Sequence, residues 1–214
     1  FGFDSIEADL STRPEKSIGN SDDWEKATNS LKSALENQNI SYVTAHGEGA
    51  FYGPKIDLHV KDAIGRRWQL STIQVDFAQP NNFDLQFVDS NNKRVKPVMI
   101  HRALLGSIER FTGILIENYA GEFPGWLSPV QVKVLTIGDV SNYVNKITKS
   151  IKGFRYEVDD RNLRLGEKLH DAKKDKVPIT LIVGEKDELS NTLAINIRSQ
   201  DNQQNVKYED AIKQ

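Results

Sequence analysis

The stretch Lys55-Ile56-Asp57-Leu58-His59-Val60 alternates strictly between polar and apolar residues. Because successive side chains of a β-strand point to opposite faces, this pattern predicts a strand with Ile56, Leu58 and Val60 in a core and with one polar face. Further strands are predicted over residues 67–77, 83–88 and 96–101, with a turn at residues 89–92. Their short connections indicate an antiparallel sheet.

Two helices flank these predicted strands. In the first, residues Trp24, Ala27, Leu31, Ala34 and Leu35 recur at helical spacing. Ser21 or Asp22 is the expected cap of this helix. The second is predicted from about Arg102 to Tyr119. The first part of the chain is therefore expected to have an α+β fold.

A second domain is predicted after the Pro- and Gly-rich stretch at residues 123–129. Strands predicted at 130–137, 154–158, 177–183 and 193–197 alternate there with helices at 141–152 and 162–174. Such alternation indicates βαβ units and a mixed or parallel sheet, that is, an α/β domain. The expected domains are residues 1–126 and 127–214.

Composition narrows the class of protein. The chain has 214 residues, 38% of them hydrophobic and 27% charged, which is typical of a globular protein. No apolar run approaches 18 residues, so no membrane span is expected. The absence of cysteine excludes disulfides and fits a cytoplasmic protein. A net charge of −2 argues against purely electrostatic nucleic-acid binding. The first residue is not Met and no signal peptide follows it, which indicates a cut end.

Three passages carry polar residues in patterns that suit a ligand site. On the predicted second helix, Ala103, Ser107 and Arg110 fall on one stripe, a plausible phosphate-facing set. Residues 47–55 contain three glycines that allow close backbone approach to a ligand. In residues 67–77, Thr72 and Gln74 share a strand face with Asp76. Taken alone, each pattern favours a structural interpretation: a solvated arginine, a hairpin loop and an exposed strand face.

Together, and in this order, the passages resemble the threonyl-tRNA synthetase family of class II synthetases. The matching segments are residues 48–55, 68–69, 72–77 and 98–110, and residues 10–19 and 123–132 extend the match. The resemblance covers essentially the whole chain and favours a functional role for each passage. It implies the end of an antiparallel class II catalytic core followed by an anticodon-binding domain.

The resemblance implies ATP-dependent attachment of threonine to tRNA(Thr) through a threonyl-adenylate, with magnesium accompanying ATP. Arg110 is expected to clamp phosphate charge and Ser107 to contact the nucleotide. The other expected positions are Lys55 and Gln69 in catalysis, Gln69 and Thr72 at ATP, and Tyr52, Gln74 and Ala103 at threonine.

His101 matches a zinc ligand of the family. The two other ligands, a cysteine and a histidine, are absent from these 214 residues, as are the first two class II motifs. Zinc with three protein ligands keeps an open position that the amino and hydroxyl groups of threonine fill, whereas valine lacks the hydroxyl. The resemblance therefore implies a fragment that is inactive alone, while the full-length enzyme is expected to be a zinc-dependent, cytoplasmic homodimer.

In the second domain, residues 160–168 resemble the anticodon-binding domain shared by several class II synthetases. Arg161, Arg164 and Lys168 are expected to form a basic helix stripe suited to phosphates, with a solvated face as the alternative. Asn162 matches a position that reads an anticodon base. The segment 184–187 matches a family motif in which Asp187 replaces the usual Glu. Asn196 stands where the family has a base-reading Arg, and Arg198 is a candidate substitute.

Two further expectations follow. A non-catalytic tRNA-binding or regulatory paralogue is the alternative function, although Lys55, Gln69, His101 and Arg110 are intact. The strand that contains Trp68 is expected to have a β-bulge near Leu70-Ser71. Gln69 lies three residues from Thr72, so a regular strand would point the two side chains to opposite faces.

Overall fold

The computed structural model describes residues 1–3, 5–200 and 203–211. The chain divides into two compact units, Phe1–Asn118 and Tyr119–Gln214. The division precedes the boundary expected at residues 126–127, because the intervening segment is hydrogen-bonded to the second unit. The Arg198 guanidinium donates to the carbonyls of Glu122 and Phe123. The limits 1–126 and 127–214 stay a prediction.

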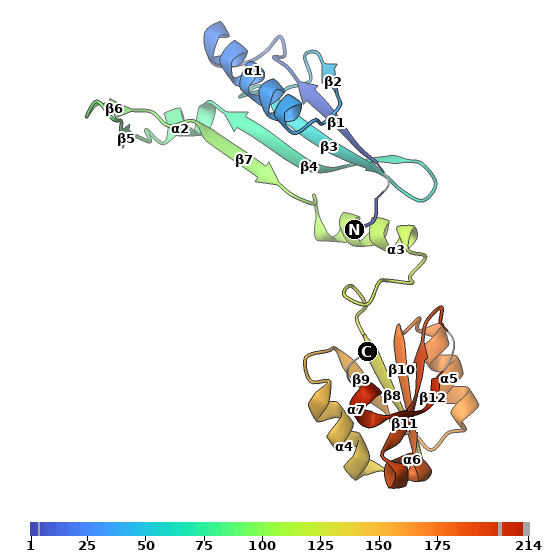
Figure 1. Cartoon of the computed structure of the whole chain (residues 1–214). Helices are drawn as coiled ribbons and strands as arrows, with labels where there is room; N and C mark the ends of the chain where they lie inside the picture. The colour runs from blue at the N-terminus through green and yellow to red at the C-terminus, as the bar shows by residue number, and fades with distance from the viewer. Residues whose placement is uncertain (4, 201–202, 212–214) are drawn as a thin grey trace. The chain divides into compact units, whose positions relative to one another are not determined.

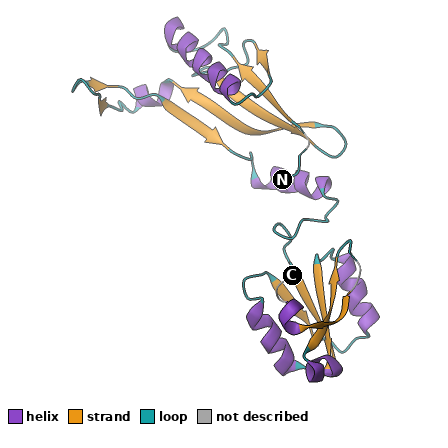
Figure 2. Cartoon of the chain, in the orientation of Figure 1, coloured by secondary structure: helices purple, strands orange, loops and turns teal. Residues whose placement is uncertain are grey.

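The first unit is built on one five-stranded sheet (Figures 1 and 2), in the strand order β2-β1-β3-β4-β7. All neighbouring strands are antiparallel except β1 and β2, which are parallel. The elements are β1 (Ile6–Ser11), α1 (Ser21–Asn37), β2 (Tyr42–Ala45), β3 (Lys55–Lys61), β4 (Arg67–Asp76), α2 (Ala78–Asn82), β5 (Phe87–Val88), β6 (Arg94–Val95), β7 (Met99–Ala103) and α3 (Ile108–Asn118). The expected α+β class is confirmed.

Helix α1 covers one face of this sheet (Figure 1). Its apolar side packs Ala27, Leu31 and Leu35 against Leu10 of β1 and Ile56 of β3. The cap of α1 is Asn20, whose Oδ1 accepts a hydrogen bond from the Asp23 backbone N–H at 2.7 Å. The sequence-based choice of Ser21 or Asp22 was therefore wrong by one or two positions. Because α1 occupies one face, the ligand-facing side chains must lie on the other.

The largest difference from the sequence-based prediction concerns residues 98–110. The expected helix from Arg102 begins only at Ile108, because the ladder between β4 and β7 continues to Ala103, which pairs with Thr72. Gly106, with φ +69°, adopts the left-handed conformation and separates strand from helix. The helical stripe of Ala103, Ser107 and Arg110 does not exist. The strand predicted over 83–88 is likewise reduced to Phe87–Val88.

The second unit contains a five-stranded mixed sheet in the order β12-β11-β10-β8-β9. Strands β9, β8 and β10 are parallel, and β11 and β12 are antiparallel to their neighbours. The elements are β8 (Val132–Ile137), α4 (Ser141–Ser150), β9 (Tyr156–Asp159), α5 (Leu165–Lys174), β10 (Ile179–Gly184), α6 (Glu185–Ser190), β11 (Thr192–Ile197), β12 (Gln203–Lys207) and α7 (Tyr208–Ala211). The expected α/β class is confirmed, whereas α6, β12 and α7 were not predicted.

Helices cover both faces of the second sheet (Figure 1). On the face of α4, Tyr143 and Ile147 pack against Val134, Val183 and Leu193. On the opposite face lies α5, which contacts β8. The parallel connections run from β8 through α4 to β9, and then through α5 back across β8 to β10. The chain thus reverses its winding direction at β8, and ligands of open α/β sheets bind beyond the carboxyl ends of strands at such a point.

Candidate functional sites

The face of the first sheet opposite α1 brings together most of the site residues expected in this unit. Lys55 pairs with Gln74, and Gln74 pairs with His101. Two residues further along β3, Asp57 pairs with Thr72, and Thr72 pairs with Ala103. Directly paired residues point to the same face of a sheet. The backbone register therefore places residues that are distant in sequence side by side. Strand pairing, rather than the expected helical stripe, brings Ala103 to this face.

A β-bulge adds Gln69 to this face, as expected. Leu58 pairs with Ser71 but the next residue, His59, pairs with Gln69, so Leu70 is the extra residue of β4. The Leu70 side chain is buried. The Gln69 amide nitrogen lies 2.9 Å from Thr72 Oγ1, which shows that the two side chains share a face. The prediction of a bulge near Leu70-Ser71 is confirmed.

Asp57 is a residue that sequence reasoning did not single out. It is 4% exposed, and its carboxylate accepts hydrogen bonds from three expected site residues. These are Lys55 Nζ at 2.5 Å, Gln69 Nε2 at 2.6 Å and Thr72 Oγ1 at 2.7 Å. We call these four residues the Asp57 cluster. The available signal was an acidic residue on the polar face of a strand whose neighbours, Ile56 and Leu58, face the core.

The glycine-containing segment before β3 closes over β4. A Cβ built on Gly53 would lie 1.8 Å from the carbonyl oxygen of Val75, so only glycine permits this backbone crossing. The crossing places Tyr52 beside β4, where its hydroxyl donates to Gln74 Oε1 at 3.0 Å. The segment is a turn, closed by an isolated bridge between Ala50 and Gly53, and it contains Tyr52, which is expected at the site.

His101 is oriented by a buried carboxylate. One of its ring nitrogens, Nε2, lies 2.7 Å from Oδ2 of Asp76. Burial alone would raise the pKa of Asp76, but hydrogen bonds from the Gln79 backbone, His101 and the Ala78 backbone outweigh it and lower that pKa. A carboxylate that fixes one imidazole nitrogen is the usual support of a metal-ligating histidine, so His101 fits the expected role. Within the described residues no three His, Cys, Asp or Glu side chains form a group that could hold a metal ion.

Arg110 and Ser107 lie next to the bulged strand. The Arg110 guanidinium donates to the carbonyl oxygen of Gln69 at 3.1 Å and is 6.0 Å from the centre of the Trp68 ring. Ser107 Oγ accepts a hydrogen bond from the Arg110 backbone N–H at 3.2 Å, as an N-terminal helix cap does. Both residues are exposed. The guanidinium is thus joined to the Asp57 cluster through the backbone of Gln69.

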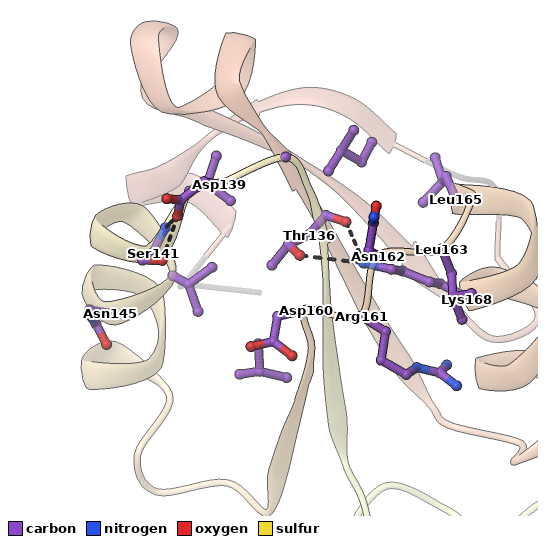
Figure 3. A pocket seen from close by; sticks show the side chains of 15 residues that line it. Thr136, Asp139, Ser141, Asn145, Asp160, Arg161, Asn162, Leu163, Leu165 and Lys168 are labelled. Carbon is purple, nitrogen blue, oxygen red and sulfur yellow. Dashed lines mark hydrogen bonds between the residues drawn. The ribbon is translucent and has the colours of Figure 1, made fainter.

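A pocket of about 690 Å³ lies in the second unit at the carboxyl ends of β8 and β9. Figure 3 shows its polar lining, which comes from the loop after β8, the start of α4 and the loop after β9. Asn162 lines this pocket, which lies on the β9 side of β8 rather than between β8 and β10, where the strand order reverses. Sequence reasoning missed the other polar lining residues, which are Thr136, Asp139, Ser141, Asn145 and Asp160.

The expected basic stripe of the second unit is not present. Helix α5 begins at Leu165, so Arg161 and Arg164 precede it. Arg161 is ion-paired with Asp159 and Asp171, at 2.6 and 2.7 Å, and its hydrogen bond to Asp159 lowers the pKa of that carboxyl. Lys168 is buried, and its Nζ donates to the carbonyls of Thr136 and Asp159. These three residues therefore do not form a solvent-facing stripe on one helix that could bind a phosphate.

Two other residues expected to contact the anticodon already hold structural bonds. Asp187 caps α6 by accepting from the Gly184 backbone N–H at 2.9 Å. The Arg198 guanidinium donates to the carbonyl of Lys176 at 2.7 Å, in addition to those of Glu122 and Phe123. Of the expected anticodon contacts, Asn162, Arg161 and Lys168 line the pocket.

The two folds are those of a class II tRNA synthetase core and of an anticodon-binding domain. The model of the tRNA synthetase class II core domain (G, H, P, S and T) matches residues 2–119, and that of the anticodon-binding domain matches residues 131–214. The first match covers more than half of the chain. The chain therefore belongs to the class II tRNA synthetase core family.

Its curated relatives include threonine–tRNA ligases. That of Clostridium tetani is 52% identical over 203 residues, which are 94% of this chain and 32% of that protein. That of Aquifex aeolicus is 49% identical over 205 residues, again 94% and 32%. The chain spans about a third of the length of these relatives. Within the described part of the chain, no helix has the length and apolar character that crossing a bilayer requires.

Two solved structures are similar to this one. The RNA-binding domain of threonyl-tRNA synthetase from Cryptosporidium parvum matches with a TM-score of 0.88 and 32% identity, over 99% of this chain and 55% of that one. A putative threonyl-tRNA synthetase from Aeropyrum pernix matches with a TM-score of 0.73 and 29% identity, over 97% and 51%. Both support the fold assigned to each unit.

Proposed function

We propose that this chain is part of a threonine–tRNA ligase, in which it supplies one wall of the aminoacylation site and a domain that binds the anticodon of tRNA(Thr). The observation that carries the proposal is the polar face of the first sheet. There, Tyr52, Gln74 and His101 lie beside the Asp57 cluster, whose Lys55 pairs with Gln74. The identity of about 50% to threonine–tRNA ligases supports the choice of amino acid.

The proposed reaction begins when the threonine carboxylate attacks the α-phosphorus of ATP, which forms threonyl-adenylate and releases pyrophosphate. A terminal ribose hydroxyl of the tRNA then attacks the threonyl carbonyl and releases AMP. Both steps move negative charge near the phosphates, so fixed cations and well-placed donors are the main protein contribution. Arg110 and Lys55 supply the cations. Magnesium, bound with ATP, is expected to neutralise further phosphate charge.

Threonine is proposed to lie against the row of Tyr52, Gln74 and His101, with the Ala103 backbone and methyl group beside it. The Tyr52–Gln74 hydrogen bond holds the carboxamide in one orientation. With two ligands from outside the described residues, His101 would hold zinc through the ring nitrogen that does not face Asp76. Zinc would supply an open coordination position for the amino and hydroxyl groups of threonine.

The second unit is proposed to receive anticodon bases in the pocket beyond β8 and β9. Asn162 can offer both an amide donor and a carbonyl acceptor to a base edge. Arg161 stays at the rim in its ion pair, and Lys168 stabilises the floor. Asp187 and Arg198 are proposed to contact the anticodon in addition to forming their structural hydrogen bonds. The whole enzyme is proposed to be a homodimer in the cytoplasm.

Threonine-dependent ATP–pyrophosphate exchange and tRNA binding test the two halves of the proposal. A full-length ligase that carries this segment should lose exchange in Lys55→Ala, and should bind tRNA(Thr) about 5- to 100-fold more weakly in Asn162→Ala, the range of one base contact. A transcript with a changed anticodon is the matched control, because Asn162→Ala should not weaken its binding further. Exchange that persists in Lys55→Ala would contradict the role of Lys55. Absence of exchange in the wild-type protein, with intact tRNA binding, would favour the non-catalytic tRNA-binding alternative.

A further inference from the structure

The Asp57 carboxylate has a role that neither the motifs nor the register explains. It is almost fully buried, it belongs to none of the expected contacts, and it nevertheless binds three of them. A buried carboxylate is costly unless hydrogen bonds satisfy it. Here every bond comes from a side chain expected at the nucleotide, rather than from the backbone or from the core. The cost of burying Asp57 is therefore offset by the same groups that the site needs.

We propose that Asp57 is a positioning residue that fixes which atoms Lys55, Gln69 and Thr72 present to the nucleotide. This inference rests on the proposed function of this sheet face. The proposal follows from the number of protons that the Gln69 amide and the Thr72 hydroxyl can donate. The Gln69 amide nitrogen carries two protons, one directed to Asp57 Oδ1 at 2.6 Å and one to Thr72 Oγ1 at 2.9 Å. Thr72 Oγ1 carries one proton, which it donates to Asp57 Oδ1 at 2.7 Å.

The orientation of the Gln69 amide is thereby determined. If the amide were turned over, its oxygen would face a carboxylate oxygen and a hydroxyl whose proton is already donated, so both contacts would be repulsive. Both amide protons are therefore used inside the cluster, and the side-chain oxygen of Gln69, Oε1, is the atom left for a ligand. The nucleotide group that meets it must be a hydrogen-bond donor, that is, a ribose hydroxyl or the adenine amino group.

Lys55 is held by the other carboxylate oxygen, Oδ2, at 2.5 Å. This bond keeps the ammonium on the polar face, where its remaining N–H groups can reach a phosphate. Its long side chain has about 2 kcal/mol of rotamer entropy that an unrestrained lysine would lose on binding the phosphate. Because Asp57 restricts the lysine beforehand, the cation is in place before the transition state forms.

Replacement of Asp57 by Asn in the full-length ligase tests the proposal. Asn keeps the shape but replaces one acceptor by a donor, so Lys55 or the Gln69–Thr72 pair must lose its bond. We expect kcat for ATP–pyrophosphate exchange, per active site determined by titration, to fall about 100-fold, the scale of a misplaced catalytic group. The KM for threonine should stay within about 3-fold, because the hydrogen bonds of Asp57 come from Lys55, Gln69 and Thr72 and not from Tyr52, Gln74 or His101. A purely structural role would lower the melting temperature and the number of active sites, and would leave kcat per site unchanged.

Asp9→Asn is the matched control. Asp9 lies directly opposite Asp57 on β1, and its carboxylate is bound by Arg67 rather than by an expected site residue. We expect an unchanged kcat in this variant. An Asp57→Asn enzyme with kcat within 3-fold of the wild type would overturn the proposal. A wild-type protein without any exchange activity would instead contradict the proposed function. Failure of the Asp57 proposal and failure of the proposed function are therefore distinguishable.

Side-chain NMR of the wild-type 214-residue chain tests the cluster whether or not the variant folds. Both Gln69 amide protons, assigned by their absence in Gln69→Glu, should exchange with solvent at least 10-fold more slowly than those of Gln38, which is exposed like Gln69 but lies outside the cluster. Exchange of the Gln69 protons at the rate of Gln38 would refute the proton count. Slow exchange supports it independently of any catalytic assay.

Discussion

Lys168→Met should destabilise the second unit strongly, although the substitution keeps an unbranched apolar stem and removes little more than the ammonium group. Lys168 is 2% exposed, and its Nζ donates to Thr136 O at 2.8 Å and to Asp159 O at 3.0 Å. Each charge-assisted hydrogen bond contributes about 1.5–3 kcal/mol, so the two together contribute about 3–6 kcal/mol. Burying the ammonium offsets part of this gain. We expect a net loss of about 3 kcal/mol in the free energy of unfolding.

Native-state amide hydrogen exchange measures this loss in the second unit alone. The amides of the central strands β8 and β10 exchange through global opening of the unit, so a loss of about 3 kcal/mol should speed their exchange about 100-fold. Lys174→Met, on an exposed position of the same helix, is the control and should change exchange less than 3-fold. Acceleration below 5-fold in Lys168→Met would mean that the two carbonyls are satisfied without the lysine, and the structural role assigned to it would be wrong.

Three further outcomes are expected. In the full-length ligase, Arg110→Ala should lower kcat for activation far more than it raises the KM for threonine, because a charge clamp acts mainly in the transition state; an unchanged kcat in exchange assays would contradict this role. Metal analysis of the purified 214-residue chain should find well under one zinc per chain, because His101 is a single imidazole; one zinc that is lost in His101→Ala would count against this expectation. Burial, followed by the negative charges of Asp187, Tyr208 and Glu188, raises the pKa of Tyr143 to about 12. Its contribution to stability is complete below pH 10 and should disappear as the pH rises toward 12, costing about 1 kcal/mol at pH 11. In urea unfolding of the second unit, this alkaline loss should be smaller in Tyr143→Phe, and an identical pH dependence of the two proteins would refute the assignment.

The elements of the fold were predictable where periodicity and burial agree. The alternation in residues 55–60 correctly predicted β3, and the helical spacing of Trp24, Ala27, Leu31 and Leu35 correctly predicted α1. Residues 102–107 were misassigned to a helix because their composition suits one. Pairing of Ala103 with Thr72 overrides this local preference, and such pairing depends on a strand some thirty positions away.

The common face of the expected site residues was predictable, but the hydrogen bonds between them were not. A phase argument from Gln69 and Thr72 was sufficient to predict the bulge, because strand faces alternate with a fixed period. Nothing in the local sequence indicated that Asp57 would accept three hydrogen bonds, or that Lys168 would turn inward. Both outcomes depend on which donors and acceptors the tertiary fold brings near a buried charge.

The extra residue in β4 decides how this strand responds to a kind of mutation that substitution scanning never samples. Deleting Leu70 would restore a regular ladder and would leave every residue after it in place. Gln69 would still pair with His59 and would share the polar face with Thr72 along a regular strand, and Arg67 would stay on the face where it bonds Glu7 and Asp9, whereas the buried Leu70 side chain would be lost. Related proteins aligned with a one-residue gap at this position are therefore expected to keep the glutamine on the same face, and to differ in the packing of the other face.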